Sequence, residues 1–548
     1  MQSLTRRLLS VLFLTAVFTV PALGCTNLIV GKRASADGSV MITYNADDYG
    51  SYGFIHFYAG GRHAKGEMRP LYDYETNNYL GEIPEADYTY NVVGQINEHQ
   101  LAIMETTFGG REELVDTTGL LDYGSLMYLT LQRARTAREA IDVWTSLMDT
   151  YGYRSEGESI TLADPNEVWI MELIGKGPGN KGAVWVARRL PDDCITAHAN
   201  QARITTFPLN DKANCVYSKD VIKVARERGY FSGKDSEFSF RDAYAPNDFS
   251  ARRICEARVW SFFNRFCTGM DKYIPYAAGI EEGCEEMPWC IRPDTLVTLN
   301  ALKQAMRDHF EGTPFDMTSD ISSGPYEAPY RPTPLFYEVD GKKYFNERPI
   351  STQQTAVTYI AQLRSWLPNH VGGLLWVGCD DANMVSYTPV YCCASQVPQC
   401  YAEGTANPFT FSIHSAYWLC NAVSNFVYPR YSQLFPELQH VRDRLDADLE
   451  AVVLRTDREV ASMSEEQARQ HLTAFGLRSA QAMMIQWQQL FERLIVKYND
   501  ICIKPEDNGQ YLRTSGGDHV PVQRPGFNEP YRRAIVNATG DRYLVPEE

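Results

Sequence analysis

The first half of the chain alternates short apolar runs with turn residues. Residues 25–31 (CTNLIVG) and 39–44 (SVMITY) are rich in β-branched side chains, which favour strands. The segment between these two runs ends in Asp-Gly, a pair that is typical of tight turns. The pattern therefore predicts a β-hairpin that is followed directly by polar residues.

The register of this hairpin predicts which polar residues come together. If Gly31 pairs with Ser39 across the turn, Asn45 lies opposite Cys25 and Asp47 lies just beyond it. The alternative is that these polar residues form an ordinary loop after the strand. The first interpretation predicts a polar cluster beside Cys25.

Strand pairs and helical segments follow along the chain. The segments 159–163 and 168–174 predict one hairpin, and 184–188 and 195–200 predict another. Further strands are expected at 90–95, 101–104, 362–367, 373–378 and 384–391. Apolar residues at three-to-four spacing predict helices at 120–135, 137–151, 295–309 and 436–497. Hairpins followed by helices indicate an α+β fold with antiparallel sheets.

Residues 1–24 have the parts of a secretory signal peptide. Two arginines precede a short apolar run, and Ala22-Leu23-Gly24 places small residues at positions −3 and −1 of a cleavage site. Cleavage after Gly24 would make Cys25 the first residue of the mature chain. The apolar run is shorter than the roughly 20 residues that a membrane span needs. We therefore expect an exported protein, periplasmic or extracellular, without a membrane span.

A leader followed by cysteine has a second interpretation, in which the thiol is acylated and serves only as a lipid anchor. Lipoprotein cleavage sites favour Leu at −3 and a small residue at −2, whereas this chain has Ala22 and Leu23 there. Ordinary signal-peptide cleavage fits this pattern better. A lipid-anchored binding protein without catalysis is the competing hypothesis from another functional class.

Composition narrows the function further. The chain of 548 residues has a formal net charge of −16, which disfavours nucleic-acid binding because phosphate contacts need Lys and Arg. Its thirteen cysteines favour disulfides in an exported protein. Neither a recurring CxxC pair nor HExxH occurs, so no metal site is predicted. A homo-oligomer is compatible with these features.

Dispersed segments resemble the PepD-like dipeptidases of the N-terminal nucleophile (Ntn) hydrolases. The opening CTNLIVGKRASADGSVMI is the most specific, and the other matching segments are 157–175, 197–204, 308–318, 372–391 and KYNDICIK at 497–504. The resemblance implies a four-layer αββα sandwich with a C-terminal helical segment. The expected organisation is a signal peptide (1–24), a catalytic domain (25–435), a helical segment packed on it (436–505) and a polar surface tail (506–548).

The resemblance also implies hydrolysis of the amide bond of dipeptides, with Cys25 as the nucleophile. Asp47 and Asn45 match the family's Asn-x-Asp-like stretch, and Asn200 matches the asparagine of the oxyanion hole. Related hydrolases of the same fold act on other amides, so an amidase for N-acyl amino acids or bile-acid amides is the alternative. The distal active-site arginine of the acylases has three candidates here, Arg252, Arg253 and Arg258.

An N-terminal cysteine carries a thiol and a free α-amine on the same residue. Their ordinary pKa values, about 8.5 and about 7.7–8.0, are close enough for the amine to take the thiol proton. This scheme needs no cofactor and no histidine, and His198 is expected to be a packed strand residue. Asp47 would orient the amine, and Asn200 with a backbone N–H would stabilise the oxyanion. Glu105 and Thr106 are expected to bind substrate, with packing within the sheet as the alternative.

Overall fold

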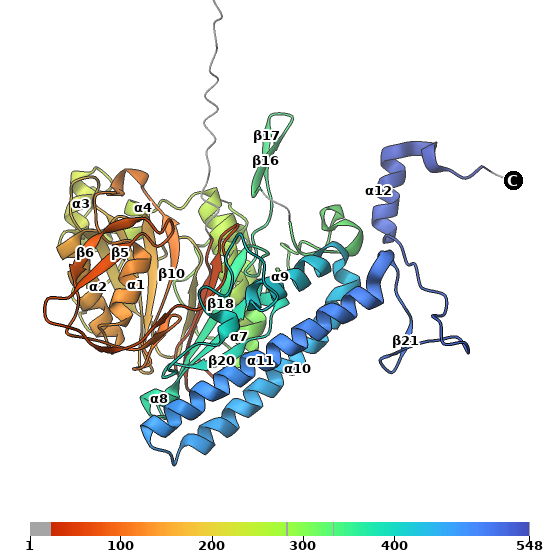
Figure 1. Cartoon of the computed structure of the whole chain (residues 1–548). Helices are drawn as coiled ribbons and strands as arrows, with labels where there is room; N and C mark the ends of the chain where they lie inside the picture. The colour runs from red at the N-terminus through yellow and green to blue at the C-terminus, as the bar shows by residue number, and fades with distance from the viewer. Residues whose placement is uncertain (1–23, 281–282, 332–333, 547–548) are drawn as a thin grey trace, which may run out of the picture.

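Two large antiparallel sheets and a pair of long helices organise the chain (Figure 1). The computed structural model describes residues 24–280, 283–331 and 334–546, and the predicted leader (1–24) lies outside these ranges except for Gly24. Within them, the chain mixes helices with antiparallel sheets, which confirms the α+β class.

The first sheet contains six strands of the described chain. Their order is β14 (Ile195–His198), β1 (Asn27–Val30), β2 (Val40–Asp47), β18 (Thr355–Leu363), β19 (Gly373–Cys379) and β20 (Thr388–Tyr391). The second sheet contains eight described strands, in the order β15 (Cys215–Tyr217), β13 (Ala183–Arg189), β12 (Val168–Gly175), β11 (Gly157–Ala163), β10 (Ala102–Gly109), β9 (Ile96–Asn97), β8 (Val92–Val93) and β3 (Phe57–Tyr58).

Short ribbons and helices complete the fold. The ribbons pair β4 (Gly61–Arg62) with β7 (Tyr88–Thr89), β5 (Met68–Tyr72) with β6 (Tyr79–Pro84), β16 (Phe336–Val339) with β17 (Lys342–Phe345), and β21 (Glu506–Asp507) with β22 (Gln510–Tyr511). The helices are α1 (Tyr123–Leu131), α2 (Ala137–Tyr151), α3 (Val221–Glu227), α4 (Phe240–Tyr244), α5 (Ala257–Phe266), α6 (Ile274–Ala277), α7 (Leu299–Met306), α8 (Asn369–Gly372), α9 (Ala416–Val427), α10 (Tyr431–Val460), α11 (Glu465–Tyr498) and α12 (Glu529–Thr539).

The first hairpin forms as predicted, but its register is shifted by one residue. Ile29 pairs with Ile42, and Thr26, rather than Cys25, lies opposite Asn45. β2 also continues to Asp47 instead of ending before the polar residues. The reason is tertiary, because β18 pairs with this end of β2 and completes its backbone hydrogen bonds.

The predicted hairpin between 184–188 and 195–200 is wrong. β13 lies in the eight-stranded sheet beside β12, whereas β14 lies in the six-stranded sheet beside β1. The chain therefore crosses between sheets at residues 190–194. The expectation rested on the tendency of consecutive strands to pair, which this crossover overrides.

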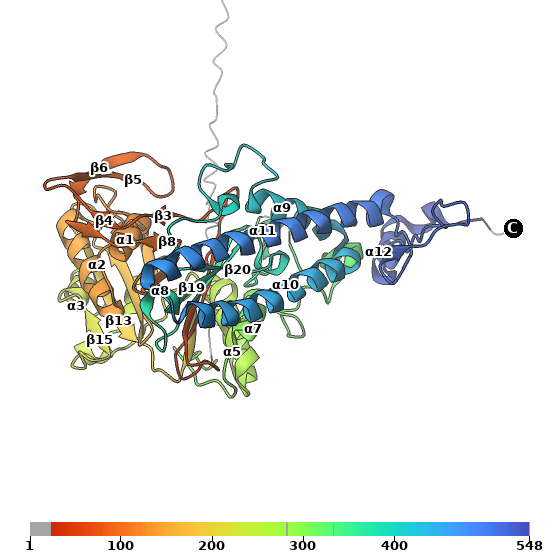
Figure 2. The ribbon, with the colours of Figure 1, turned by 60° about the horizontal axis from the view of Figure 1, so that its bottom comes forward.

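The later elements are found close to their predicted places. The strand expected at 362–367 lies earlier, at β18, and the helix expected at 295–309 shortens to α7. The helical region at 436–497 is occupied by α10 and α11, which lie side by side in Figures 1 and 2. Ser464 separates them, because its hydroxyl and the Gln467 side chain form a capping box that starts α11.

Two groups of helices pack on the two sheets. α1 and α2 pack on the eight-stranded sheet, where Trp144 and Ile160 share a buried core. α10 and α11 pack on β20 of the six-stranded sheet. A second core joins Ile42 of β2, Met104 of β10 and Trp487 of α11, so it includes residues of both sheets.

The C-terminal tail has a place of its own. It contains α12, in which none of the described residues is buried, and it lies beyond the end of α11 in both views (Figures 1 and 2). Phe527 packs edge-on against Tyr326, which ties the tail to the body of the protein. No helix in the described ranges is long and apolar enough to cross a membrane.

All thirteen cysteines lie within the described ranges, and each is a free thiol. The structure therefore shows none of the disulfides that the sequence analysis expects, and these stay a prediction. Cys194 and Cys290 lie close enough to hydrogen-bond each other, and this contact raises the pKa of Cys194.

Candidate functional site

Cys25 lies just before β1 of the six-stranded sheet and faces β10 of the eight-stranded sheet. Side chains alternate between the two faces of a strand, so Tyr44 and Asp47 of β2 point to opposite faces. Cys25 lies on the Tyr44 face, and its thiol, which is half-buried, donates to the Tyr44 hydroxyl at 3.5 Å. The sulfur also lies 3.7 Å from Glu105 Oε1 on β10. Cys25 and Glu105, both selected from the sequence, are therefore neighbours.

Arg258 joins the backbone of Cys25 to Asn200. This arginine opens α5, directly after a π-helical segment at Ala251–Glu256, and it is fully buried. Its guanidinium donates to the Cys25 carbonyl and to Asn200 Oδ1, both at 2.9 Å. Burial lowers the pKa of Arg258 to about 10, so the group is still charged at neutral pH.

The structure distinguishes the three candidate arginines by their contacts. Arg252 donates to the Ile280 carbonyl, and Arg253 pairs with Glu347, whereas Arg258 contacts the residue that carries the thiol.

Asn200 lies in the bend that follows β14, two residues beyond His198. Its φ of 65° is in the left-handed region, which asparagine tolerates better than most residues. Asn200 Nδ2 donates to the Thr107 carbonyl at 2.7 Å, while its Oδ1 accepts from Arg258. The bond to Thr107 uses one of the two amide hydrogens, and the side chain is clamped from both ends.

Asp47 forms a buried ion pair next to the predicted cleavage site. Its carboxylate accepts from Arg348 at 2.5 Å and from the Thr355 hydroxyl at 2.6 Å. Arg348 also donates to the Gly24 carbonyl, and the Gly24 N–H donates to the Asp47 carbonyl at 3.0 Å. Burial raises the pKa of Asp47, and the positive charge of Arg348 opposes that rise.

The sequence analysis missed Arg348. It lies in a Pro- and Tyr-rich stretch, far along the chain from Asp47, and nothing in its local pattern points to the site.

Asn45 supports the site from behind and does not face the thiol. Its backbone pairs with Thr26, and its Nδ2 donates to the Ile350 carbonyl at 3.0 Å. Ile350 follows Arg348 by two residues, so Asn45 helps to hold the segment that carries this arginine. The structure therefore gives Asn45 a positioning role.

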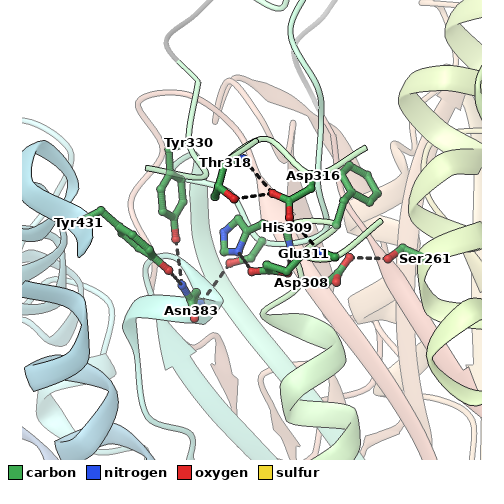
Figure 3. Close-up of polar contacts among 12 residues, drawn as sticks. Ser261, Asp308, His309, Glu311, Asp316, Thr318, Tyr330, Asn383 and Tyr431 are labelled. Carbon is green, nitrogen blue, oxygen red and sulfur yellow. Dashed lines mark hydrogen bonds and ion pairs between the residues drawn. The ribbon is translucent and has the colours of Figure 1, made fainter. Parts of the chain in front are cut away.

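The segment 308–318, one of those that carry the family resemblance, supports the same region (Figure 3). Asp308 accepts from the Ser261 hydroxyl at 2.6 Å, and its carbonyl accepts from the Ser351 N–H at 3.0 Å. The ring of His309 contacts Glu311 at 3.1 Å. These contacts fix the loop beside residues 348–351, which hold Arg348 at Asp47.

Thr106 and Glu105 point to opposite faces of β10. The Thr106 hydroxyl shares a hydrogen bond with His198 Nδ1 at 2.7 Å, and the other ring nitrogen contacts the Thr161 hydroxyl at 2.7 Å. The structure therefore does not place Thr106 at the thiol, where the sequence analysis expected it to bind substrate. Burial lowers the pKa of His198 to about 3, which confirms it as a neutral, packed strand residue.

The surroundings of Cys25 disfavour its thiolate while the preceding residue is attached. Burial is the main cause of the raised pKa of the thiol, and the negative charges of Glu105 and Asp47 raise it further. With Gly24 in place, the nitrogen of Cys25 is an amide and has no basic lone pair. A base at this position would require the free α-amine.

A cavity of about 870 Å³ opens beside these groups. Its lining includes Gly24, Thr107, Asn200, Arg258 and Arg348. This volume is in the range of sites that bind small molecules, and its lining includes charged and amide side chains. The arrangement places a clamped amide and space for a small molecule next to the residue that precedes the Cys25 thiol.

Arg258→Lys is expected to lower kcat by about 10–100-fold, with KM changed by less than about threefold. A lysine offers one nitrogen and loses the fork that spans Cys25 and Asn200, so both groups shift. Steady-state kinetics with a dipeptide measures the effect. The matched control is Arg252→Lys, whose guanidinium contacts Ile280 instead. A folded Arg258→Lys protein with native kcat would contradict the role.

Comparison with known proteins finds one peptidase family and several similar proteins named as dipeptidases. The model of the family described as Peptidase family C69 matches residues 24–59 and 67–444. A "Probable dipeptidase" of Salmonella dublin is 27% identical over 67% of this chain and 81% of its own length. A "Probable dipeptidase" of Latilactobacillus sakei is 25% identical over 74% and 81%, respectively. "Dipeptidase A" of Lactobacillus helveticus is 24% identical over 82% and 91%.

Proposed function

Because the chain belongs to peptidase family C69 and is a cysteine-type dipeptidase, we propose that Cys25, freed by removal of the leader, is its nucleophile. The observation that carries this proposal is the set of groups converging on residue 25. Arg258 holds its carbonyl, the Asp47–Arg348 pair holds the residue before it, and Asn200 lies alongside. We propose dipeptides as the substrates.

The reaction follows from these positions. The free α-amine of Cys25 takes the thiol proton, and the thiolate attacks the carbonyl of the scissile amide. Asn200 Nδ2 and a backbone N–H would stabilise the tetrahedral oxyanion. The C–N bond then breaks, the protonated amine gives its proton to the departing amino acid, and a thioester forms on Cys25. Water, activated by the same amine, cleaves the thioester and restores the thiol.

The Asp47–Arg348 pair would orient the new amine. In the full-length chain, Arg348 holds the Gly24 carbonyl and Asp47 accepts from the Gly24 N–H through its backbone. Loss of Gly24 frees these groups beside the new terminus. A carboxylate near the amine stabilises the protonated amine. It therefore favours transfer of the thiol proton to the amine.

We also propose the four-layer αββα arrangement of the Ntn hydrolases for this chain. Support comes from the packing of α1 and α2 on one sheet and of α10 and α11 on the other. Ile42 of the six-stranded sheet and Met104 of the eight-stranded sheet belong to one buried core, so the two sheets share it.

Export completes the proposal, with the mature protein periplasmic or extracellular. The mass and N-terminal sequence of the mature protein, purified from its native export route, test this directly. We expect a chain that begins with unmodified Cys25 and hydrolyses dipeptides. A lipid-modified Cys25 without dipeptide hydrolysis would instead establish the anchored binding protein.

A further inference from the structure

A buried carboxyl group lies beside the Cys25 thiol, a second lies against the first, and neither takes part in the proton transfers above. Glu105 on β10 accepts from the Tyr44 hydroxyl at 2.5 Å and lies 3.7 Å from the Cys25 sulfur. Glu158 on the neighbouring strand β11 accepts from the Thr107 hydroxyl at 2.7 Å. Thr107 also lines the cavity of about 870 Å³. Glu105 and Glu158 are called the carboxyl pair below.

Both members of the carboxyl pair are short of hydrogen-bond donors. Each side chain is at most 1% exposed, no donor of the described residues reaches the Oε2 atom of either, and the two carboxyl groups hydrogen-bond each other. Burial raises the pKa of Glu105 to about 7 and the pKa of Glu158 well above its ordinary value. Buried carboxylates are costly unless they are paired. The pair therefore needs a shared proton or a cation.

In the free enzyme, the carboxyl pair acts against the nucleophile. After burial, the negative charge of Glu105 is the next cause of the raised pKa of Cys25. A cation bound at Glu105 would cancel this charge and favour the thiolate. The natural source of such a cation is the substrate.

The geometry fits the α-ammonium group of a dipeptide. That nitrogen is bonded to the carbon next to the carbonyl that the thiolate attacks. With the sulfur about 3–3.5 Å from the carbonyl carbon, the ammonium nitrogen lies roughly 3–5 Å from the sulfur. Glu105 Oε1 lies at a similar distance from the sulfur, 3.7 Å. An N-acyl amino acid has no cation at this position.

Two tyrosines lie near the carboxyl pair. The rings of Tyr74 and Tyr123 meet edge-on, with centroids 5.5 Å apart. After burial, the charge of Glu105 is the next cause that raises the pKa of each. Tyr74 is partly exposed, at 36%, and so connects this region with solvent. Aromatic faces attract cations, so the region around Tyr74 and Tyr123 suits an ammonium group.

We propose that Glu105, backed by Glu158, binds the free α-ammonium group of the dipeptide and so selects substrates with a free amino end. The proposal rests on the proposed function, because it takes Cys25 as the nucleophile. When the ammonium binds, the carboxyl pair keeps the single proton that it shares. The bound cation then neutralises the remaining negative charge beside the forming thiolate.

Glu105→Gln, which removes the charge, tests this assignment. KM for Ala-Ala is expected to rise about 10–100-fold, the usual effect of losing a charge-assisted hydrogen bond. Turnover of N-acetyl-Ala-Ala is expected to stay the same or rise. The matched control is Glu113→Gln, because Glu113 also accepts from a tyrosine hydroxyl, that of Tyr230. Equal losses with both substrates, or an unchanged KM for Ala-Ala, would overturn the proposal.

A second measurement uses the unaltered enzyme, in case the variant fails to fold. The carboxyl pair already shares one proton, and because burial raises the pKa of both groups it takes up a second proton as the pH falls, while the dipeptide keeps its ammonium charge. KM for Ala-Ala should therefore rise as the pH is lowered, and KM for N-acetyl-Ala-Ala should not. Parallel pH profiles for the two substrates would overturn the proposal.

The mass of the trapped acyl-enzyme separates this proposal from the proposed function. If the native enzyme forms no thioester on Cys25, the proposed function fails, and this proposal fails with it. If the thioester forms but Glu105→Gln leaves KM for Ala-Ala unchanged, only the assignment of the α-ammonium site fails.

Discussion

Cys25→Ser is expected to lower kcat for dipeptide hydrolysis by at least about 10⁴-fold, the scale of losing a nucleophile. The α-amine can take a proton from a thiol near neutral pH, because their pKa values are close. A serine hydroxyl holds its proton far more tightly, and no other base lies in hydrogen-bond contact with residue 25 in the described chain except the Tyr44–Glu105 pair. Steady-state assays with Ala-Ala measure the loss.

The matched control for this variant is Cys267→Ser. Cys267 is also half-buried, but its thiol donates to the Arg292 carbonyl, away from the site. We expect native activity from this control and a native melting temperature from both proteins. More than a tenth of native turnover in folded Cys25→Ser would rule out Cys25 as the nucleophile.

A chain that keeps Gly24 in front of Cys25 is expected to fold but to be almost inactive, with kcat lower by about 10²–10⁴-fold. The nitrogen of Cys25 is then an amide and accepts no proton. Gly24 also occupies the groups proposed for the amine, since its carbonyl binds Arg348 and its N–H binds the Asp47 carbonyl. The assay compares this chain with one that starts at Cys25.

The control for the extended chain tests whether cleavage that exposes Cys25 restores activity. A site-specific protease sequence placed before Gly24, and in a parallel protein directly before Cys25, gives two products that differ by one residue. Only the product that starts at Cys25 should gain activity on cleavage. Equal activity of the two products would show that the free α-amine is not the base.

Much of the local structure was predictable from the sequence. The first hairpin, α2 and the long C-terminal helices follow from the spacing of apolar residues, which is set by each element's own period. Cys25 and Glu105 were selected from residue type and position, and the structure places them in contact.

Other features depended on contacts between distant segments. The register of β1 and β2 differed from the expected one by one residue, and β2 extends to Asp47 because β18 pairs with its far side. β14 left its expected partner β13 and joined β1 in the other sheet. Pairing energies of strands far apart in the chain decide such choices, and local patterns carry little of that information.

By itself, the sequence determined the apolar periods, the turn positions, and the residue types Cys25, Asp47 and Asn200 at the ends of short strands. Only the tertiary structure decided which charges meet there. It selected Arg258 among three arginines and brought Arg348 to Asp47. The physical reason is that a buried charge must be paired through space, and its partner comes from whichever segment the fold packs beside it.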